Sequence, residues 1–413
     1  MSETPENRVL VIGAGTMGAG IAQVAAAGGW DVALQDVDVD TVTRAIASVR
    51  GRFDRLVEKG RMTADDAAAA GARLCVATPG DAGQCALVIE AIVEDLDVKC
   101  AVLTPLVRHL PPEAIVATNT SSLSVTAIGA AIGLADRTVG MHFFNPAPLL
   151  PLVEVIAGAG SDPACVTRVA AIAKSWGKKV ARAADVPGFI VNHVARPYYL
   201  EAFRIIEDGH ADAAAIDEAM RELGGFRMGP LELTDLIGQD VNTATTRSVW
   251  EQLDRPPLLA PSRVQEQLVA DGHLGRKTGR GAYDYTGGTP ACVLTPTGVA
   301  SPVPTGVKIA VAAFVRGATD ETGTDLQAYI FARILAALIT QAAHAEARAV
   351  ATATDIDIAL RYGTNYPRGP LAWADSIGIE TVVELLDALN GTVSDNRFAP
   401  PPTLAAASAA GGR

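Results

Sequence analysis

The sequence predicts an N-terminal α/β domain, in which helices wrap a parallel sheet, followed by an all-α domain that is duplicated. Over about the first 185 residues, short β-branched runs alternate with Ala-rich helical stretches, and only helical patterns follow. An internal match at a constant offset of 140 residues indicates the duplication. The 413-residue chain therefore divides into an α/β domain at 1–186, a helical domain at 187–285, a linker at 286–324, a second helical copy at 325–395 and a mobile tail at 396–413.

Six β-branched runs predict the strands of the sheet, and two later runs predict edge strands. The six lie at 8–12, 31–35, 74–77, 86–90, 114–118 and 138–143, and the edge strands at 152–156 and 179–181. The stretches between them predict helices at 17–27, 40–59, 96–109 and 164–175. The alternation stops at the sequence DVPG, residues 185–188, which marks the domain boundary.

The helical part contains a repeat and a linker. Residues 216–238 align without gaps with 356–378, and ten of the 23 positions are identical, Gly-Pro-Leu among them. Ala332 corresponds to Asn192, so the second copy keeps its packing signature but loses this polar residue. We hypothesise that copy two docks on copy one within the chain, as a pseudo-dimer; a homodimer with pairing between subunits is the alternative. Between the copies, the apolar run 308–315 predicts one strand in a Gly-, Pro- and Thr-rich linker.

Composition excludes several classes of function. The chain has 34 Lys+Arg against 46 Asp+Glu and a net charge of −12, so we expect no nucleic-acid or anionic-membrane partner. Its five cysteines are scattered without a CxxC, which predicts reduced thiols and no metal site. The first eight residues are polar, and no uninterrupted apolar run reaches about 18 residues. We therefore expect a cytoplasmic protein.

A glycine motif, GAGTMG at residues 13–18, follows the first strand and opens a helix, which is the context of a Rossmann-type dinucleotide-binding domain. Gly13 allows a tight turn, Gly15 lets the backbone approach a pyrophosphate, and Gly18 lets the helix pack on the sheet. Asp36 ends the second strand, where its carboxylate would accept hydrogen bonds from a ribose and repel a 2′-phosphate, so NAD is favoured over NADP. A glycine-rich turn without a ligand is the alternative. The motif places Gly13, Gly15, Thr16, Met17, Gly18 and Asp36 in the cofactor site.

Polar residues also follow the later strands. Asn119 and Ser121 come after the fifth strand, and His142 ends the sixth. Glu154 lies on the next strand, where it could orient His142 as a general base; a buried structural histidine is the alternative. Asn192 begins the first helix after the boundary, as a cleft residue or simply a polar group at the helix start.

A basic stripe lies on the helix after Asp36. Arg52, Arg55 and Lys59 are spaced i, i+3 and i+7, so they share one face. This face could bind the phosphates of an anionic substrate, or it could simply be solvated.

Together these motifs resemble the 3-hydroxyacyl-CoA dehydrogenases. GAGTMGAGIA, VIEAIVED, TNTSSLS, GMHFFNPAP, LVEV, PGFIVN and MGPLELTDLIGQD occur in the family's order, and LGRKTGRGAYDY follows at 274–285. The resemblance covers residues 8 to about 285, and the repeat extends it to about 395. It is strongest with bacterial members that have a doubled C-terminal domain, acting on 3-hydroxybutyryl-CoA or, in phenylacetate breakdown, on 3-hydroxyadipyl-CoA.

The resemblance implies NAD-dependent oxidation of an (S)-3-hydroxyacyl-CoA to the 3-oxoacyl-CoA, as in fatty-acid β-oxidation. It implies that His142 is the general base, Glu154 its orienting carboxylate, and Ser121 and Asn192 the groups that hold the substrate oxygen or thioester carbonyl. The implied cofactor contacts further include Glu94, Lys99, Asn119, Asn145 and Lys277, and the implied CoA contacts are Ser121, Arg52 and Lys59.

Two other functions fit parts of the pattern. The β-hydroxyacid dehydrogenases resemble one another in using a Lys base at the start of the interdomain helix, where this chain has Asn192 and His193 and no nearby Lys. A non-catalytic, NAD-binding structural protein, such as the lens crystallins related to the family, is the second alternative.

Overall fold

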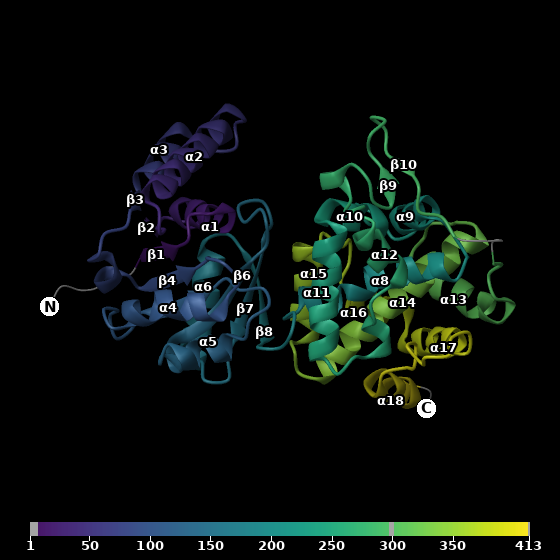
Figure 1. The fold of residues 1–413 in the computed structure, drawn as a ribbon. Helices are drawn as coiled ribbons and strands as arrows, with labels where there is room; N and C mark the ends of the chain where they lie inside the picture. Colours follow the sequence, from purple (N-terminus) through teal and green to yellow (C-terminus); the bar gives the residue numbers. More distant parts are fainter. Residues whose placement is uncertain (1–6, 297–300, 412–413) are drawn as a thin grey trace. The chain divides into compact units, whose positions relative to one another are not determined.

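The computed structural model describes residues 7–296 and 301–411 and divides into two compact units, Met1–Phe189 and Ile190–Arg413 (Figure 1). Residues 1–6, 297–300 and 412–413 lie outside the described residues. These positions carry most of the polar N-terminal start, part of the predicted linker and the end of the predicted tail.

Unit 1 is built on an eight-stranded sheet with the order β3-β2-β1-β4-β5-β6-β7-β8. The strands are β1 (Arg8–Ile12), β2 (Asp31–Gln35), β3 (Leu74–Val76), β4 (Leu87–Glu90), β5 (Ile115–Thr118), β6 (Thr138–Phe143), β7 (Leu152–Ala157) and β8 (Lys179–Ala184). All neighbouring strands are parallel except β6 and β7, which are antiparallel. The order of the first six strands is that of a Rossmann fold, whose switch point lies between β1 and β4.

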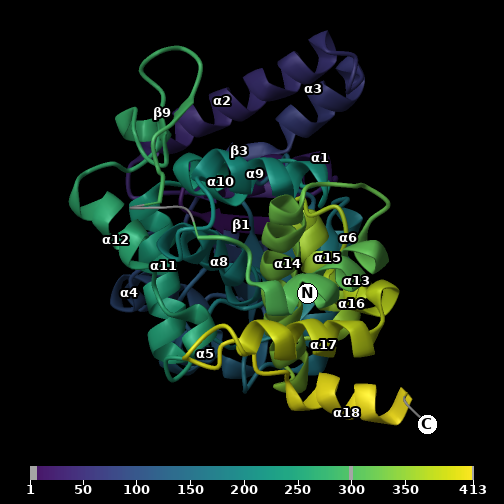
Figure 2. The same cartoon turned by 90° about the vertical axis from the view of Figure 1, so that its right-hand side faces the viewer.

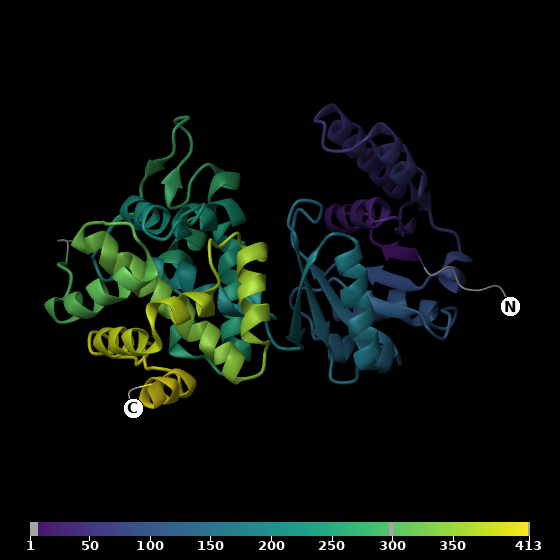
Figure 3. The same cartoon turned by 180° about the vertical axis from the view of Figure 1, so that it is seen from behind.

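Both faces of the sheet are buried, which explains its apolar strands. Val9 and Val11 belong to one core, and Leu10 and Ile12 to the other, because successive side chains of a strand point to opposite faces. The helices of unit 1 are α1 (Thr16–Ala27), α2 (Val39–Glu58), α3 (Ala64–Ala72), α4 (Leu96–Val107), α5 (Val125–Ala131) and α6 (Pro163–Ser175). Apart from α4 and α5, they all cover the face of Val9, as Figures 1 and 3 show.

Three features of unit 1 differ from the sequence-based expectation. β7 is not an edge strand, because it pairs with β6 on one side and β8 on the other. The helices α3 and α5 were not predicted; they have only nine and seven residues, too short for a clear period. α3 packs against α2 as a helical pair at the margin of the unit (Figure 1).

Unit 2 is helical within its described residues, apart from a two-stranded ribbon. Its helices are α7 (Val191–Val194), α8 (Arg196–Glu207), α9 (Ala213–Glu222), α10 (Pro230–Ile237), α11 (Gln239–Gln252), α12 (Arg263–Ala270), α13 (Lys308–Ala318), α14 (Asp325–Ala347), α15 (Ala353–Gly363), α16 (Pro370–Ile377), α17 (Ile379–Asn390) and α18 (Pro402–Gly411). The ribbon pairs β9 (Tyr283–Asp284) with β10 (Ala291–Cys292).

Two expectations for unit 2 are wrong. The apolar run at 308–315 is not a strand but lies in α13, where Val311 and Phe314, three residues apart, are buried on one helical face. The low-complexity tail forms the helix α18, which packs beside α17 (Figure 2). Ala-rich sequence has high helix propensity, so packing against α17 is enough to order it as a helix.

The repeat is structural as well as sequential. The order α8–α11 of copy one recurs as α14–α17 in copy two. Asp217 accepts hydrogen bonds from the backbone N–H groups of Leu231 and Glu232 at the start of α10, and Asp357 does the same at the start of α16. Copy two docks on copy one within the chain, since α14 packs along α8 and α9.

A buried ion network joins the two copies. Glu201 on α8 is fully buried and binds Arg204 of its own copy, Arg333 of the second copy and Arg397 of the segment after it, at 2.6, 2.9 and 3.0 Å. Burial alone would raise the pKa of Glu201, but these guanidinium groups lower it to about 2. By length and composition α14 could cross a membrane, yet 83% of its apolar stretch is buried inside the structure, as expected for a core helix.

Glu201→Gln tests this network. The substitution keeps the volume of the side chain but removes the buried charge that three guanidinium groups share, leaving Arg333 and Arg397 only their exposed carboxylate partners Asp208 and Asp395. We therefore expect the free energy of unfolding to fall by about 3–5 kcal/mol. Urea denaturation measures the loss. Asp38→Asn, which removes an exposed partner of Arg44, is the control and should change stability by less than about 1 kcal/mol. An equally small change for Glu201→Gln would show that the network does not hold the copies together.

Candidate active site

The glycine loop connects β1 to α1 at the carboxyl edge of the sheet. Gly13 has a φ of +101°, and a Cβ there would lie 2.4 Å from the Ala91 carbonyl oxygen. A Cβ on Gly18 would lie 1.7 Å from the Gly13 carbonyl oxygen. Around Gly15, in contrast, a Cβ would meet no described atom within 4 Å. The turn therefore requires glycine at positions 13 and 18, whereas Gly15 leaves the backbone open to a ligand at the N-terminus of α1.

Asp36 follows β2 and faces this loop. Its Oδ2 accepts a hydrogen bond from the Ala14 backbone N–H at 2.7 Å, which ties the end of β2 to the glycine loop. The side chain is only half-buried, so its second oxygen can still accept hydrogen bonds from a ligand. Thr16 and Met17 occupy the first turn of α1.

Glu94 organises the turn after β5. Its Oε1 accepts hydrogen bonds from the Thr120 hydroxyl at 2.6 Å and from the backbone N–H groups of Ser121 and Ser122 at 2.9 and 3.0 Å. Burial would raise the pKa of Glu94, but these hydrogen bonds and the charge of Lys99 lower it to about 2. The carboxylate thereby sets the position of Ser121, whose side chain is exposed at the sheet edge.

Lys99 holds Glu94 in place through an ion pair. Its ammonium group is fully buried and lies 2.6 Å from Glu90 and 3.2 Å from Glu94. The Glu90 carboxylate also accepts a hydrogen bond from the Thr118 hydroxyl at 2.7 Å. Because the Lys99 amine is enclosed by carboxylates, it positions Glu94 rather than facing outward as its predicted cofactor contact would require.

Asn119 joins two strand ends. Its side-chain oxygen accepts a hydrogen bond from the Phe143 backbone N–H at 2.8 Å, which ties the end of β5 to the end of β6. Asn145 lies two residues further along, exposed at the same edge and joined to Pro146 by a cis peptide bond.

His142 and Glu154 meet through the register of β6 and β7. The two residues are direct partners in the antiparallel pair, and His142 Nδ1 lies 2.7 Å from Glu154 Oε2. Glu154 is fully buried and His142 is 6% exposed. Since an ionised carboxylate only accepts hydrogen bonds, Nδ1 carries the proton and Nε2 is left as the basic nitrogen. The ring centroids of Phe144 and Phe189 lie 4.5 and 5.7 Å from the centroid of the imidazole ring.

A basic cavity of about 380 Å³ lies between α2 and the loop after β6. Arg52, Arg55 and Lys59 line it from α2 and its C-terminus, and Arg61 adds a fourth cation. The opposite wall is formed by residues 145–149. No carboxylate lines the cavity among the described residues, so it suits an anionic ligand such as a phosphate.

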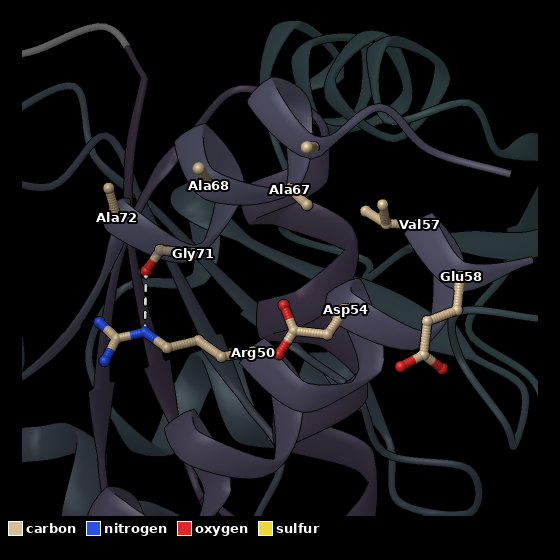
Figure 4. A pocket seen from close by; sticks show the side chains of 9 residues that line it. Arg50, Asp54, Val57, Glu58, Ala67, Ala68, Gly71 and Ala72 are labelled. Carbon is tan, nitrogen blue, oxygen red and sulfur yellow. Dashed lines mark hydrogen bonds between the residues drawn. The ribbon is translucent and has the colours of Figure 1, made fainter. Parts of the chain in front are cut away.

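A second hollow, on the other side of α2, has a different character. It lies between α2 and α3 and is lined by Asp54, Glu58 and several alanines (Figure 4). Its cation, Arg50, donates to the Gly71 carbonyl oxygen at 3.1 Å and to that of Leu74 at 3.2 Å. With that cation engaged and two carboxylates in the wall, this hollow does not suit an anion.

Two predicted site residues belong to unit 2. Asn192 lies on α7, is half-buried, and accepts a hydrogen bond from Arg196 at 3.3 Å. Lys277 follows α12 in a short turn, and its ammonium group is 2.5 Å from Asp240.

Sequence reasoning missed Arg61, Gln23 and Asp235. Arg61 comes only two residues after Lys59, so the charge run itself could have indicated it. Gln23 accepts a hydrogen bond from Arg52 at 3.2 Å and also lines the basic cavity. Asp235 is buried and accepts hydrogen bonds from the backbone N–H groups of Ala282 and Tyr283, which explains the pairing of the two motifs GPLELTD and GRGAYDY.

Two family models match the chain. The model described as "3-hydroxyacyl-CoA dehydrogenase, NAD binding domain" matches residues 8–186. The model described as "3-hydroxyacyl-CoA dehydrogenase, C-terminal domain" matches residues 188–285 and again 329–412. The second match accords with the structural repeat.

Relatives and solved structures agree with these models. The chain is 38% identical to the 3-hydroxyadipyl-CoA dehydrogenase of Escherichia coli K12, over an alignment of 452 residues that covers 95% of each chain. It is 41% identical to the 3-hydroxybutyryl-CoA dehydrogenase of Bradyrhizobium diazoefficiens over 284 residues, 68% of this chain and 97% of the other. A crystal structure of 3-hydroxybutyryl-CoA dehydrogenase from Escherichia coli K12 matches with a TM-score of 0.87 and 35% identity, covering 99% of this chain and all of the other.

The pKa of Glu94 predicts how stability depends on pH. Because it falls from 4.5 to about 2 on folding, the stabilisation from ionised Glu94 is fully present above pH 4.5 and is lost as the pH falls through about 2. Urea denaturation of the wild type and Glu94→Gln should therefore show a difference that is constant from pH 7 to 5 and shrinks below pH 4.5. Glu384→Gln, at an exposed position on α17, supplies the baseline for removing a carboxylate. A Glu94→Gln difference that does not change with pH would contradict the assignment.

Proposed function

Because the chain belongs to the 3-hydroxyacyl-CoA dehydrogenase family of NAD-dependent oxidoreductases, we propose that it oxidises an (S)-3-hydroxyacyl-CoA to the 3-oxoacyl-CoA. The substrates named for its relatives, 3-hydroxyadipyl-CoA and 3-hydroxybutyryl-CoA, are the proposed acyl chains. The observation that carries the proposal is the hydrogen-bonded pair His142–Glu154 at the edge of the sheet.

His142 is the general base of the proposed reaction. Its Nδ1–H donates to Glu154, so Nε2 is free to take the proton of the 3-hydroxyl group. As the imidazole becomes charged, the buried carboxylate stabilises it. Phe144 and Phe189 hold the ring in place by packing against it.

Unit 1 fits a bound NAD. The open backbone at Gly15, the N-terminus of α1 and the carboxylate of Asp36 would hold the pyrophosphate and the adenosine ribose. When bound, the nicotinamide accepts the hydride from C3 of the substrate. Asn119, Asn145 and Glu94 border this site, Glu94 by fixing the turn at Ser121.

The remaining groups bind the acyl-CoA. Ser121 and Asn192 hold the substrate oxygen or the thioester carbonyl, as donors for the charge that develops there. Arg52, Arg55, Lys59 and Arg61 bind the phosphates of CoA in the basic cavity. Copy two of the helical domain packs on copy one, where a partner subunit would otherwise pack. This packing supports an internal pseudo-dimer of the two copies.

His142→Gln tests the base. Removing general base catalysis should lower kcat by at least about 100-fold, while NADH binding measured by fluorescence stays within about threefold. Glu154→Gln should lower kcat as well, because it no longer orients and stabilises the imidazolium. The assay is reduction of acetoacetyl-CoA with NADH, and His109→Gln, at an exposed position after α4, is the control. Near-wild-type turnover by His142→Gln would refute the mechanism, and a wild type without any turnover would favour the non-catalytic, structural alternative.

Asp36 predicts the choice of cofactor. Its carboxylate would face the 2′-phosphate of NADPH, so we expect kcat/KM to be at least about 100-fold higher with NADH. Asp36→Asn removes the charge and keeps the acceptor for Ala14, and should narrow this ratio by about tenfold or more. Asp38→Asn is the control, because asparagine can still cap the N-terminus of α2. This variant should leave the ratio of kcat/KM with NADH to kcat/KM with NADPH unchanged. Equal values for NADH and NADPH in the wild type would show that Asp36 does not face the ribose.

A further inference from the structure

Arg196 is a buried cation of unit 2 to which the described residues offer no carboxylate. It begins α8 and is 4% exposed. Nη2 donates to Asn192 at 3.3 Å and Nη1 to the Thr246 hydroxyl at 3.5 Å, both near the outer limit of a hydrogen bond. Nε has no hydrogen-bond partner within residues 7–296 and 301–411. Since a guanidinium group stays protonated in proteins, this region holds a positive charge that is not neutralised.

Other buried arginines of unit 2 have a counter-ion. Arg204, Arg333 and Arg397 all bind Glu201. A buried charge without a partner is unfavourable by several kcal/mol, which is why such groups are normally paired. The contrast indicates that the counter-ion of Arg196 comes from outside the described chain.

Tyr366 supplies a second unsatisfied group in the same region. It lies in the loop between α15 and α16, and its buried hydroxyl has no partner in the described part of the chain. Its ring packs on Tyr198 and Phe226, with centroids 5.3 and 4.9 Å apart. The Arg196 guanidinium group lies over the Tyr199 ring, 5.0 Å from its centroid, and the Tyr199 ring contacts that of Tyr198. Arg196 and Tyr366 therefore adjoin the same aromatic cluster.

The repeat shows that these groups are not part of the shared scaffold. At the offset of 140 residues, Arg196 corresponds to Ala336, and Tyr366 corresponds to Phe226. Each polar group therefore occurs once, Arg196 in copy one and Tyr366 in copy two. Residues required for helix packing alone would be expected in both copies. Arg196 and Tyr366 therefore have a role other than packing, to which each copy contributes one residue.

We propose that Arg196 and Tyr366 bind the terminal carboxylate of a dicarboxylic 3-hydroxyacyl-CoA, such as 3-hydroxyadipyl-CoA. The inference rests on the proposed function, because it takes Asn192 as the group that holds the reacting end of the substrate. Arg196 begins α8 just after the short helix α7 that carries Asn192, and its Nη2 lies 3.3 Å from the Asn192 side-chain oxygen, so the two side chains are neighbours. The carboxylate carbon of 3-hydroxyadipyl-CoA lies three bonds beyond C3, about 3.8 Å when extended. A substrate held at its reacting end by Asn192 therefore brings its terminal carboxylate next to the guanidinium group, whose Nε–H has no partner among the described residues.

The terminal group thereby decides specificity. A carboxylate accepts two hydrogen bonds from the guanidinium group, Nε–H included, and a third from the Tyr366 hydroxyl. The 3-hydroxybutyryl chain ends one bond beyond C3 in a methyl group, which accepts no hydrogen bond from these donors. The 3-hydroxyhexanoyl chain has the same number of carbons as the adipyl chain but ends in a methyl group, so it isolates the effect of the charge.

The test compares kcat/KM for 3-hydroxyadipyl-CoA and 3-hydroxyhexanoyl-CoA, with NAD saturating, in the full-length protein. The wild type should prefer the adipyl substrate by at least about 100-fold, because a methyl group would leave both donors unpaired. Arg196→Met should bring this ratio close to one while changing kcat/KM for the hexanoyl substrate by less than about tenfold. Tyr366→Phe, which restores the residue found in copy one, should lower the ratio by about tenfold through the adipyl substrate alone.

Arg247→Met is the matched control, since Arg247 lies on α11 in an exposed ion pair with Glu266. A wild-type ratio near one overturns the proposal, as does an equal loss on both substrates in Arg196→Met or Tyr366→Phe. If Arg196→Met fails to fold, the wild-type ratio and Tyr366→Phe decide. If the wild type turns over neither of these substrates nor acetoacetyl-CoA, the proposed function fails and this inference with it. If it turns over acetoacetyl-CoA but does not prefer the adipyl substrate to the hexanoyl one, only the carboxylate site is refuted.

Discussion

The antiparallel pairing of β7 with β6 is the constraint on which the reacting end of unit 1 depends. Without it the sheet would be a plain parallel one, whose neighbouring strands are joined by long crossovers. The short return after β6 instead brings Glu154 directly opposite His142. The register then determines the orientation of the imidazole, because a shift by one residue would turn Glu154 to the other face of the sheet.

Other carboxylates of the chain also fix local geometry by accepting several hydrogen bonds. Glu94 holds the Ser121 turn, and Asp217 and Asp357 each fix the start of a helix through two backbone N–H groups. Glu201 gathers three guanidinium groups where the two helical copies meet. In each case several donors converge on one carboxylate, and this makes the local geometry unique. Arg196 departs from this pattern, since its charge has no such partner among the described residues.

The two helical copies have diverged around a common scaffold. They share Gly-Pro-Leu at the start of α10 and α16 and the Asp that binds that helix start, so their packing is alike. Polar residues differ between them, with Asn192 and Arg196 replaced by alanine in copy two and Phe226 replaced by Tyr366. Duplication within one chain frees each copy from serving both sides of a symmetric interface. The two copies can then contribute different groups to one purpose.

The Rossmann-type core, the glycine loop and the helical repeat could all be predicted from the amino-acid sequence. These depend on local rules, since strand and helix periods, a required positive φ and a constant offset are all visible along the chain. It also indicated the partnership of His142 and Glu154, because two adjacent strands limit where a side chain can lie. Short or Ala-rich elements were missed or misassigned, α3, α13 and α18 among them, because their conformation comes from packing rather than from period.

The pairing of charges, in contrast, became clear only from the three-dimensional fold. It placed Lys99 between Glu90 and Glu94, gathered Arg61 with the stripe of α2, and joined Glu201 to arginines far away in the sequence. It also separated Arg204, which has a carboxylate partner, from Arg196, which has none within the described chain, although both lie on α8. No local pattern contains this information, because the free energy of a charge depends on its burial and on partners brought close by the fold.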